Sequence, residues 1–369
     1  MLVSSKISNG INGIADIPGD KSISHRSIII PSIAKGVTEI KNILKSEDVK
    51  KTMNALKLLG VKIEEQNNDI IIYGKGLNSL KKPKSKIDLG NSGTSARLLA
   101  GLLAAQNFDS NLFGDFSLSK RPMKRIIEPL KLMGAKIESN HSKLPIKISG
   151  TKLKNISYVL EIPSAQVKSG IALAALFIKD KTTLIEKHIT RNHTEIMLEY
   201  FNSEIKVDKK DDGNHITIRG QKELIPKNIE VPSDLSSAAF FIVAALINKN
   251  SHLIMKNINL NPSRDGILKA LEMMGAKIIL NNNKIINGEI VGDIEVYSSE
   301  LNGCELDSNM ARLMIDEYPI LSIAASFAKS PSIFKGLSEL RVKESDRLEL
   351  IRHNLDKCGV FCEIIENNL

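Results

Sequence analysis

The stretch LKLLGVKIE, residues 56–64, decides the fold, because copies of it return along the chain. It has the pattern of a helix end, then a glycine that suits a left-handed backbone, then a β-prone strand. Four other stretches share this pattern, the last two in weaker form: LKLMGAKIE (130–138), LEMMGAKII (271–279), LDKCGVFCE (355–363) and MLEYFNSEIKV (197–207). A chain that repeats one helix–Gly–strand unit is typical of a repeat architecture.

A second kind of stretch alternates with the first. Each copy opens with small polar residues and continues as an apolar helical run: KSISHRSIIIPSIA (21–34), NSGTSARLLAGLLAA (91–105), SAQVKSGIALAALF (164–177), SDLSSAAFFIVAALI (233–247) and DEYPILSIAASFA (316–328). Alternating helices and strands predict an α/β fold. Because the first N–H groups of a helix are unpaired and carry the positive end of its dipole, these polar openings predict a shared anion-binding cleft.

The number of repeats bears on the domain organisation. At 369 residues the chain is long enough for two domains. Repeats tend to pack symmetrically, so five units are an awkward number. If two lobes hold three units each, a sixth unit would follow Leu369, and we therefore expect the chain to be a truncated product.

The composition narrows the class of protein. A hydrophobic content of 42% and a charged content of 25% are typical of a soluble globular protein. The longest apolar stretch, residues 238–247, is too short to span a bilayer, and the first ten residues lack the pattern of a signal peptide. The three cysteines (Cys304, Cys358, Cys362) have no CxxC spacing, which favours reduced thiols, a cytoplasmic location and no metal cluster.

The net charge of +9 favours anionic partners. The lysines and arginines are scattered along the chain, however, and aromatic residues make up only 4% of it, without tryptophan. A surface that stacks nucleic-acid bases is therefore not expected. Small acidic metabolites are the better prediction.

The stretch PGDKSISHRS (18–27) is the first candidate anion site. Asp20 is suited to cap a helix, and Lys21 and Arg26 would then lie beside the N–H groups of its first turn. This arrangement is how proteins hold phosphate or carboxylate. The stretch by itself is equally compatible with a capped helix that carries two solvated cations.

Seven motifs together point to a family. In chain order they are PGDKSISHRS (18–27), LGNSGTSARLL (89–99), GDFSLSKRPM (114–123), IPSAQVKSG (162–170), TRNHTEIML (190–198), MIDEYPIL (314–321) and LRVKESDRL (340–348). With them the chain resembles the 5-enolpyruvylshikimate-3-phosphate synthases (3-phosphoshikimate 1-carboxyvinyltransferases), in particular the class II branch. The resemblance implies a two-lobed inverse α/β prism of βαβαββ units, with one lobe formed by residues 1–15 and 232–369 and the other by residues 16–231.

The same resemblance implies the reaction. An enzyme of this family transfers the enolpyruvyl group of phosphoenolpyruvate to the 5-hydroxyl of shikimate 3-phosphate and releases phosphate, on the pathway to aromatic amino acids. It is expected to need no metal or organic cofactor, to act as a monomer, and to bind neither nucleic acid nor membrane.

The resemblance also assigns residues to roles. For shikimate 3-phosphate they are Lys21, Ser22, Arg26, Ser164, Ala165, Gln166, Arg191, Asp316 and Lys343. For phosphoenolpyruvate they are Lys21, Gly93, Arg121, Gln166 and Arg347. Asp316 is expected to act as the base toward the 5-hydroxyl, with Glu344 and Lys21 handling the proton at the methylene carbon. His25 and His193 are expected to be structural.

Two other interpretations stay open at this point. The sister family, the UDP-N-acetylglucosamine enolpyruvyl transferases, would be expected to carry a reactive cysteine in the first lobe, whereas Cys304 is the first cysteine of this chain. The chain could also be an inactive phosphoanion-binding fragment, because the Asp-His-Arg stretch expected late in the family does not follow Cys362.

Overall fold

The computed structural model describes residues 9–369 and divides them into two compact units. Unit 1 contains the residues up to Pro18 together with Pro232–Leu369, and unit 2 contains Gly19–Val231. Each unit has its own cluster of buried apolar side chains, and the chain passes from one unit to the other twice.

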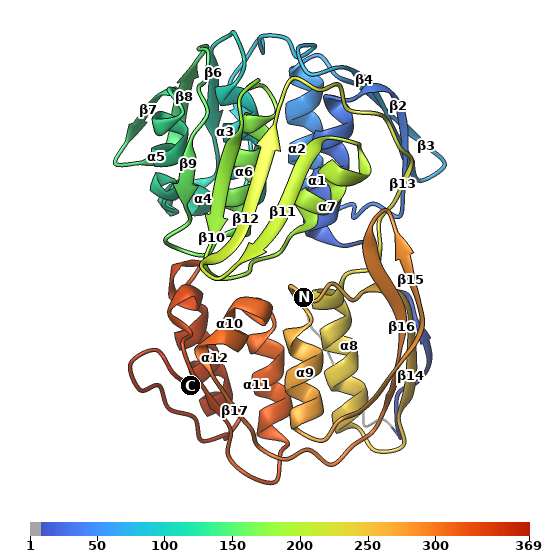
Figure 1. Cartoon of the computed structure of the whole chain (residues 1–369). Coiled ribbons are helices and arrows are strands. Elements are labelled where there is room, and N and C mark those ends of the chain that lie inside the picture. Colours follow the sequence, from blue (N-terminus) through green and yellow to red (C-terminus); the bar gives the residue numbers. More distant parts are fainter. Residues whose placement is uncertain (1–8) are drawn as a thin grey trace. The chain divides into compact units, whose positions relative to one another are not determined.

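Unit 2 is built from three four-stranded sheets, and Figure 1 shows its helices enclosed among them. The first sheet has the order β13 (Ile229–Glu230), β2 (Lys35–Lys41), β4 (Asp69–Lys75), β3 (Lys62–Gln66). The second has the order β5 (Ile87–Asp88), β6 (Ser110–Phe113), β8 (Lys143–Ser149), β7 (Lys136–Asn140). The third has the order β9 (Ser157–Val159), β10 (Thr182–Glu186), β12 (Gly213–Arg219), β11 (Glu204–Lys210). In each sheet the first two strands are parallel and the other pairings are antiparallel, as the βαβαββ unit requires.

Seven helices of unit 2 connect these strands: α1 (Lys21–Ser32), α2 (Glu47–Leu58), α3 (Gly93–Ala104), α4 (Phe116–Lys120), α5 (Lys124–Leu132), α6 (Ala165–Ala175) and α7 (His193–Tyr200). The apolar runs expected to be buried helices are α1, α3 and α6. Their bodies are buried almost throughout. The first residues of α1 and α6 are exposed or half-buried, whereas the first turn of α3 is buried as well.

Unit 1 contains one four-stranded sheet of the same kind and a shorter pair of strands. Its elements are β1 (Asn12–Ala15), α8 (Leu235–Ile247), β14 (His252–Asn259), α9 (Gly266–Met273), β15 (Lys277–Ile286), β16 (Glu289–Tyr297), β17 (Glu305–Leu306), α10 (Ser308–Met314), α11 (Tyr318–Ser326), β18 (Ile333–Phe334), a short 3-10 helix (Ser338–Val342) and α12 (Arg347–Lys357). The described part of this unit forms a sheet of order β1-β14-β16-β15 and a short parallel pair, β17 and β18. The last residues lie beside β18, because Phe334 and Leu369 exchange backbone hydrogen bonds of 2.8 and 2.9 Å.

Where the chain passes between the units, the first strand of one sheet in each unit comes from a distant part of the sequence. β1 precedes unit 2 in the sequence but pairs in parallel with β14 of unit 1. β13 follows the rest of unit 2 and pairs in parallel with β2, near its start. Each of these sheets is therefore completed by a strand from a distant part of the chain.

The recurring helix–Gly–strand stretch has the backbone that the sequence predicts. The glycines at its centre have positive φ: Gly60 (87°), Gly134 (95°), Gly275 (87°) and Gly359 (77°). In the degenerate copy Asn202 takes this position with φ 61°, and asparagine is the residue that best replaces glycine there. In all five copies the N–H that follows bonds back to the carbonyl five residues earlier, at 2.9–3.0 Å, which closes the helix with the same motif each time.

A close crossing of α3 and α6 sets the spacing of their N-termini. A Cβ added to Gly101 would lie 1.9 Å from the carbonyl oxygen of Gly170, and one added to Gly170 would lie 2.6 Å from the carbonyl oxygen of Arg97. Only residues without a side chain allow two backbones to come this near. Within residues 9–369, no helix is long and apolar enough to cross a membrane.

Candidate active site

The polar openings of the buried helices are capped by their own side chains. Asp20 accepts from the N–H of Ile23 at 2.8 Å, Ser92 from Ser95 at 3.1 Å, Ser164 from Val167 at 3.4 Å and Asp234 from Ser236 at 3.0 Å. Such a cap satisfies one of the free N–H groups and leaves the other first-turn groups at the helix start. Ser164, predicted to bind shikimate 3-phosphate, is thus also the cap of α6.

The start of α1 carries one exposed and one buried cation. The side chain of Lys21 is half exposed, and its Nζ lies 3.5 Å from Asp48 Oδ2. Arg26, in contrast, is buried and donates to Ser22 O at 2.7 Å, to Ser169 Oγ at 2.8 Å and to Thr194 Oγ1 at 2.6 Å. It therefore joins α1, α6 and α7, a structural role that sequence reasoning did not foresee.

His25 lies inside unit 2 at the head of a chain of side-chain hydrogen bonds. Its Nδ1 is 2.8 Å from Thr52 Oγ1, which is 2.5 Å from Ser95 Oγ, and Ser95 Oγ donates to Ser92 Oγ at 2.6 Å. Burial, followed by the charges of Lys21 and Arg26, lowers the pKa of His25 to about 3. A neutral imidazole linked in this way supports the structural reading of His25.

Three of the residues predicted for phosphoenolpyruvate meet at the starts of α3 and α6. A Cβ added to Gly93 would lie 3.1 Å from Arg121 Nη1, so the bare backbone of Gly93 faces that guanidinium. Arg121 donates to Asn91 Oδ1. Gln166 donates to Thr94 Oγ1 at 3.0 Å, which ties the start of α6 to the first turn of α3.

Arg97 belongs to the same group, although the sequence did not single it out. Its Nη1 donates to Gln166 Oε1 at 3.0 Å and to Gly93 O at 3.1 Å, and its Nη2 donates to Pro122 O at 3.2 Å. The available signal was its spacing, since a residue four positions after Gly93 lies on the same face of α3. Arg97 thus holds Gln166 and Gly93 at fixed positions relative to each other.

The remaining predicted residues of unit 2 lie at the ends of elements. Ser164 and Ala165 are half-buried at the start of α6, and Arg191 is half-buried in the segment that leads into α7. His193 is the first residue of α7 and is buried.

Unit 1 brings all four of its predicted residues into one cluster. Asp316 lies between α10 and α11, and its Oδ1 is 3.2 Å from Arg347 Nη1 and 3.6 Å from Lys343 Nζ. Arg347 also donates to Glu344 Oε2 at 2.6 Å. These side chains are about a third exposed, so two cations and two carboxylates are grouped where a substrate can reach them.

A neighbouring arginine, Arg341, supports the segment that carries this cluster. Arg341 donates to Asp346 Oδ2 at 2.8 Å, to Asn367 Oδ1 at 3.0 Å and to Glu366 O at 3.2 Å. Asp346 caps α12 by accepting from the N–H of Glu349 at 3.1 Å. The last residues of the chain are thus connected to the start of α12, the helix that Arg347 opens.

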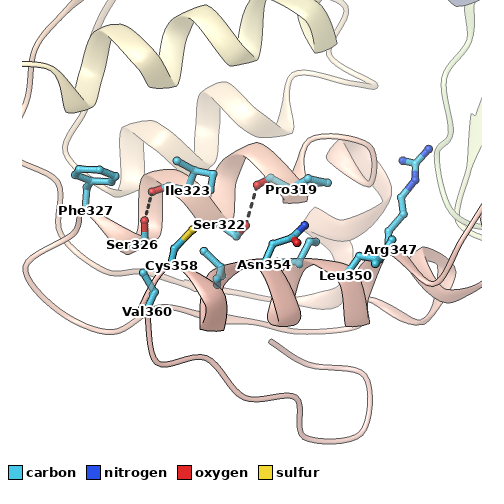
Figure 2. Close-up of a pocket in the computed structure, with 12 residues that line it drawn as sticks. Pro319, Ser322, Ile323, Ser326, Phe327, Arg347, Leu350, Asn354, Cys358 and Val360 are labelled. Carbon is cyan, nitrogen blue, oxygen red and sulfur yellow. Dashed lines mark hydrogen bonds between the residues drawn. The ribbon is translucent and has the colours of Figure 1, made fainter. Parts of the chain in front are cut away.

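A cavity of about 510 Å³ lies between α11 and α12, and Figure 2 shows Arg347 at one end of it with the guanidinium extended away from the other lining residues. Most of the lining is apolar, with Ile323, Phe327 and Leu350 among its members. Such a lining is unsuited to two anionic substrates, so the cavity is not the predicted site. In the described residues no group of three or more His, Cys, Asp and Glu side chains could hold a metal ion.

Comparison with known proteins identifies the family. EPSP synthase (3-phosphoshikimate 1-carboxyvinyltransferase) matches residues 5–369. The chain belongs to the EPSP synthase family.

Individual relatives agree with the EPSP synthase assignment. The 3-phosphoshikimate 1-carboxyvinyltransferase of Ruthia magnifica subsp. Calyptogena magnifica is 48% identical over 99% of this chain and 83% of its own length. That of Thermoanaerobacter sp. (strain X514) is 46% identical over 95% of this chain and 82% of its own length. A solved EPSP synthase from Acinetobacter baumannii superimposes with a TM-score of 0.86 at 43% identity, covering 97% of this chain and 81% of the other.

These findings confirm the α/β fold, the EPSP synthase family and the transferase class predicted from the sequence. The family match covers residues 5–369, and the chain spans 82–83% of the length of the two curated relatives named above.

Proposed function

We propose that the chain transfers the enolpyruvyl group of phosphoenolpyruvate to the 5-hydroxyl of shikimate 3-phosphate and releases phosphate, with the residues predicted from the sequence as its site. One observation carries the assignment of residues: Asp316, Lys343, Glu344 and Arg347, chosen from two separate motifs, form one cluster. Family membership supports the reaction itself.

Phosphoenolpyruvate is held through its two anionic groups. In this proposal Arg121, Arg347 and Lys21 neutralise the carboxylate and the phosphate, because arginine offers a planar fork that matches either group. Gly93 lets the ligand approach backbone N–H groups at the start of α3, and Gln166 supplies a neutral donor. Arg97 orients Gln166 through the hydrogen bond at 3.0 Å.

Shikimate 3-phosphate is held, in this proposal, by three sets of polar and charged groups. Lys21 and Ser22 form the first set, Ser164, Ala165 and Gln166 the second, and Arg191, Asp316 and Lys343 the third. Arg26, predicted for the first set, is buried and supports it from inside unit 2 through its hydrogen bond to Ser22 O. Hydroxyl, amide and backbone N–H donors at helix starts suit a phosphate and a ring with several hydroxyls.

The chemistry is an addition followed by an elimination. Asp316 accepts the proton of the 5-hydroxyl while the hydroxyl oxygen bonds to C2 of phosphoenolpyruvate. Glu344 or Lys21 supplies a proton to the methylene carbon. Loss of phosphate from C2 and of a proton from the resulting methyl group then restores the double bond. General acid–base catalysis of this kind contributes about 100- to 10,000-fold, and the grouped cations stabilise the developing negative charge.

The deciding experiment measures phosphate release from the chain mixed with both substrates. Asp316→Asn is expected to lower turnover by about 100-fold or more while shikimate 3-phosphate still binds. Asp356→Asn, at an exposed position of α12, serves as the matched control. Unchanged turnover in Asp316→Asn would exclude the role of the carboxylate.

Two further results would redirect the proposal. Phosphate release only when UDP-N-acetylglucosamine replaces shikimate 3-phosphate would favour the sister family, and binding of both substrates without phosphate release would favour a binding protein. We also propose that the protein is a monomer and that it is located in the cytoplasm; its three free cysteines favour this location. Light scattering of the purified chain measures its oligomeric state.

A further inference from the structure

A buried lysine in α6 is used by no step of the proposed reaction. Lys168 lies two residues after Gln166, and its side chain is 1% exposed. Lysine is almost never buried to this degree unless it is paired, because removing its charge from water is costly. The environment of Lys168 therefore calls for an explanation.

Two buried carboxylates face the ammonium group. Lys168 Nζ lies 2.7 Å from Glu195 Oε1 and 2.9 Å from Glu186 Oε1, and it also donates to the carbonyl of Thr190 at 3.4 Å. Burial lowers the pKa of Lys168, but the charges of Glu195 and Glu186 outweigh it and raise the pKa above its usual value. Lys168 is therefore charged and satisfied by these two partners.

The two carboxylates delimit one short segment. Glu186 ends β10, and Glu195 lies in the first turn of α7. Glu186 Oε1 also accepts from the N–H of Thr190 at 2.9 Å and from its hydroxyl at 2.5 Å. The segment 186–195 is thus closed on itself by Glu186 and fastened to α6 by Lys168.

A second connection runs beside the first. Ser169 and Thr194, the sequence neighbours of Lys168 and Glu195, are 2.7 Å apart through their hydroxyl oxygens, and Arg26 donates to both. The start of α7 is therefore held against α6 by two adjacent sets of polar contacts. Arg191 lies within the fastened segment, directly after Thr190.

We propose that Lys168, Glu186 and Glu195 form a clasp that sets the position of Arg191 relative to the start of α6, which makes Lys168 a positioning residue for binding of the phosphorylated substrate. This inference rests on the proposed role of Arg191 in holding shikimate 3-phosphate. Between β10 and α7 the backbone of this segment forms no helix or strand, so its conformation depends on these side-chain contacts. Donors that bind an anion must be held to within a fraction of an ångström, which a buried ion pair achieves more firmly than a solvated loop.

The test compares Lys168→Met with a matched control, Lys206→Met, which replaces an exposed lysine of β11. Because a misplacement of about 1 Å can cost roughly 100-fold, Lys168→Met is expected to raise the KM and Kd for shikimate 3-phosphate by about 10- to 100-fold. The KM for phosphoenolpyruvate is expected to change by less than about twofold, since its one proposed ligand in α6, Gln166, is held separately by Arg97 at 3.0 Å and the others lie outside α6 and the segment 186–195. Lys206→Met should change neither constant.

A double-mutant cycle separates positioning from mere stabilisation. Arg191→Ala is measured alone and combined with Lys168→Met. If Lys168 acts through Arg191, its replacement adds little to the Kd for shikimate 3-phosphate once Arg191 is absent. An equal loss of affinity in both backgrounds, or a lower melting temperature with the Kd unchanged, would overturn the inference.

The outcome also distinguishes this inference from the proposed function. If Arg191→Ala leaves the Kd unchanged, the proposed role of Arg191 fails, and the clasp fails with it. If Arg191→Ala weakens binding but Lys168→Met does not, only the clasp fails. Should Lys168→Met not fold, Glu195→Gln gives the same comparison, because it keeps the size of the side chain and the contact between Lys168 and Glu186. Glu195→Gln is expected to raise the Kd for shikimate 3-phosphate as well. An unchanged Kd in this variant would count against the clasp.

Discussion

Replacing Gly101 by alanine sets two physical effects of opposite sign against each other. In a helix, alanine is more favourable than glycine by about 0.8–1.0 kcal/mol, so propensity alone predicts a more stable protein. The added Cβ would lie 1.9 Å from the carbonyl oxygen of Gly170, however, a distance that side chains do not tolerate. The obstacle is backbone, not the end of a flexible side chain, so α3 and α6 must separate by at least about 1 Å.

The structure favours the clash over propensity. Overpacking of a close interior costs about 1–3 kcal/mol, and a separation of the helices also removes van der Waals contacts along their crossing. We therefore expect Gly101→Ala to lower the free energy of unfolding by about 1–3 kcal/mol, despite the better helix former. Gly170→Ala, where the nearest backbone oxygen would be 2.6 Å away, is expected to cost less.

The same substitution should affect the site. Gly93 and Gln166 lie at the starts of the two helices, so a separation of the helices stretches the contacts that Arg97 makes to both. We expect kcat/KM for phosphoenolpyruvate to fall by about 10- to 100-fold. Urea unfolding followed by circular dichroism measures the stability, and phosphate release measures the activity. A variant that is more stable than the unchanged chain, or less stable but with unchanged kcat/KM, would refute the reasoning.

Three other predictions address single contacts. Arg97→Met removes the hydrogen bonds to Gly93 and Gln166 and is expected to raise the KM for phosphoenolpyruvate by about 10-fold or more; Arg219→Met, exposed on β12, is the control, and equal KM values for both variants would contradict a role for Arg97. In Gly275→Ala the added Cβ meets no atom closer than 3.8 Å, so only the positive φ of 87° is unfavourable, and the free energy of unfolding is expected to fall by about 1–2 kcal/mol. Asn202→Gly should leave the free energy of unfolding unchanged or raise it. Chemical unfolding measures both, and a Gly275→Ala variant more stable than Asn202→Gly would contradict the backbone argument. His25 has a pKa of about 3 in the folded chain and about 6.5 in the unfolded chain. Between these pH values the unfolded chain binds more protons, so the free energy of unfolding falls as the pH falls, by up to about 1.4 kcal/mol per pH unit. His25→Asn should flatten this part of the pH–stability curve, and an unchanged slope would exclude His25 as its source.

Several features of the fold could be predicted because they depend on neighbours in the sequence. A glycine between a helix and a strand needs a left-handed backbone, and Gly60, Gly134, Gly275 and Gly359 have it. A helix cap depends on one side chain and an N–H two or three residues later, which is why the cap at Asp20 could be predicted from residue type. The alternation of these signals was enough to predict the α/β class.

The partners of individual side chains could not be predicted in this way. Arg26 was expected at the surface of an anion site, but its buried guanidinium joins three helices that are far apart in sequence. Arg97 gave no signal except its spacing from Gly93, because its role depends on a hydrogen bond to Gln166, which lies on another helix. The pairing of Lys168 with Glu186 and Glu195 likewise depends on how β10, α6 and α7 pack.

The sequence by itself determined the repeating unit, the ends of its helices and the residue types that face an anion, because local backbone preferences and hydrogen bonds over a few residues specify them. Only the tertiary structure decided which strands β1 and β13 pair with, β14 and β2 respectively. It also decided which charged groups are grouped near the surface, as around Asp316, and which are buried and paired, as around Lys168. The physical reason is that burial and pairing depend on distances between segments that are remote in sequence, and those distances are set by packing.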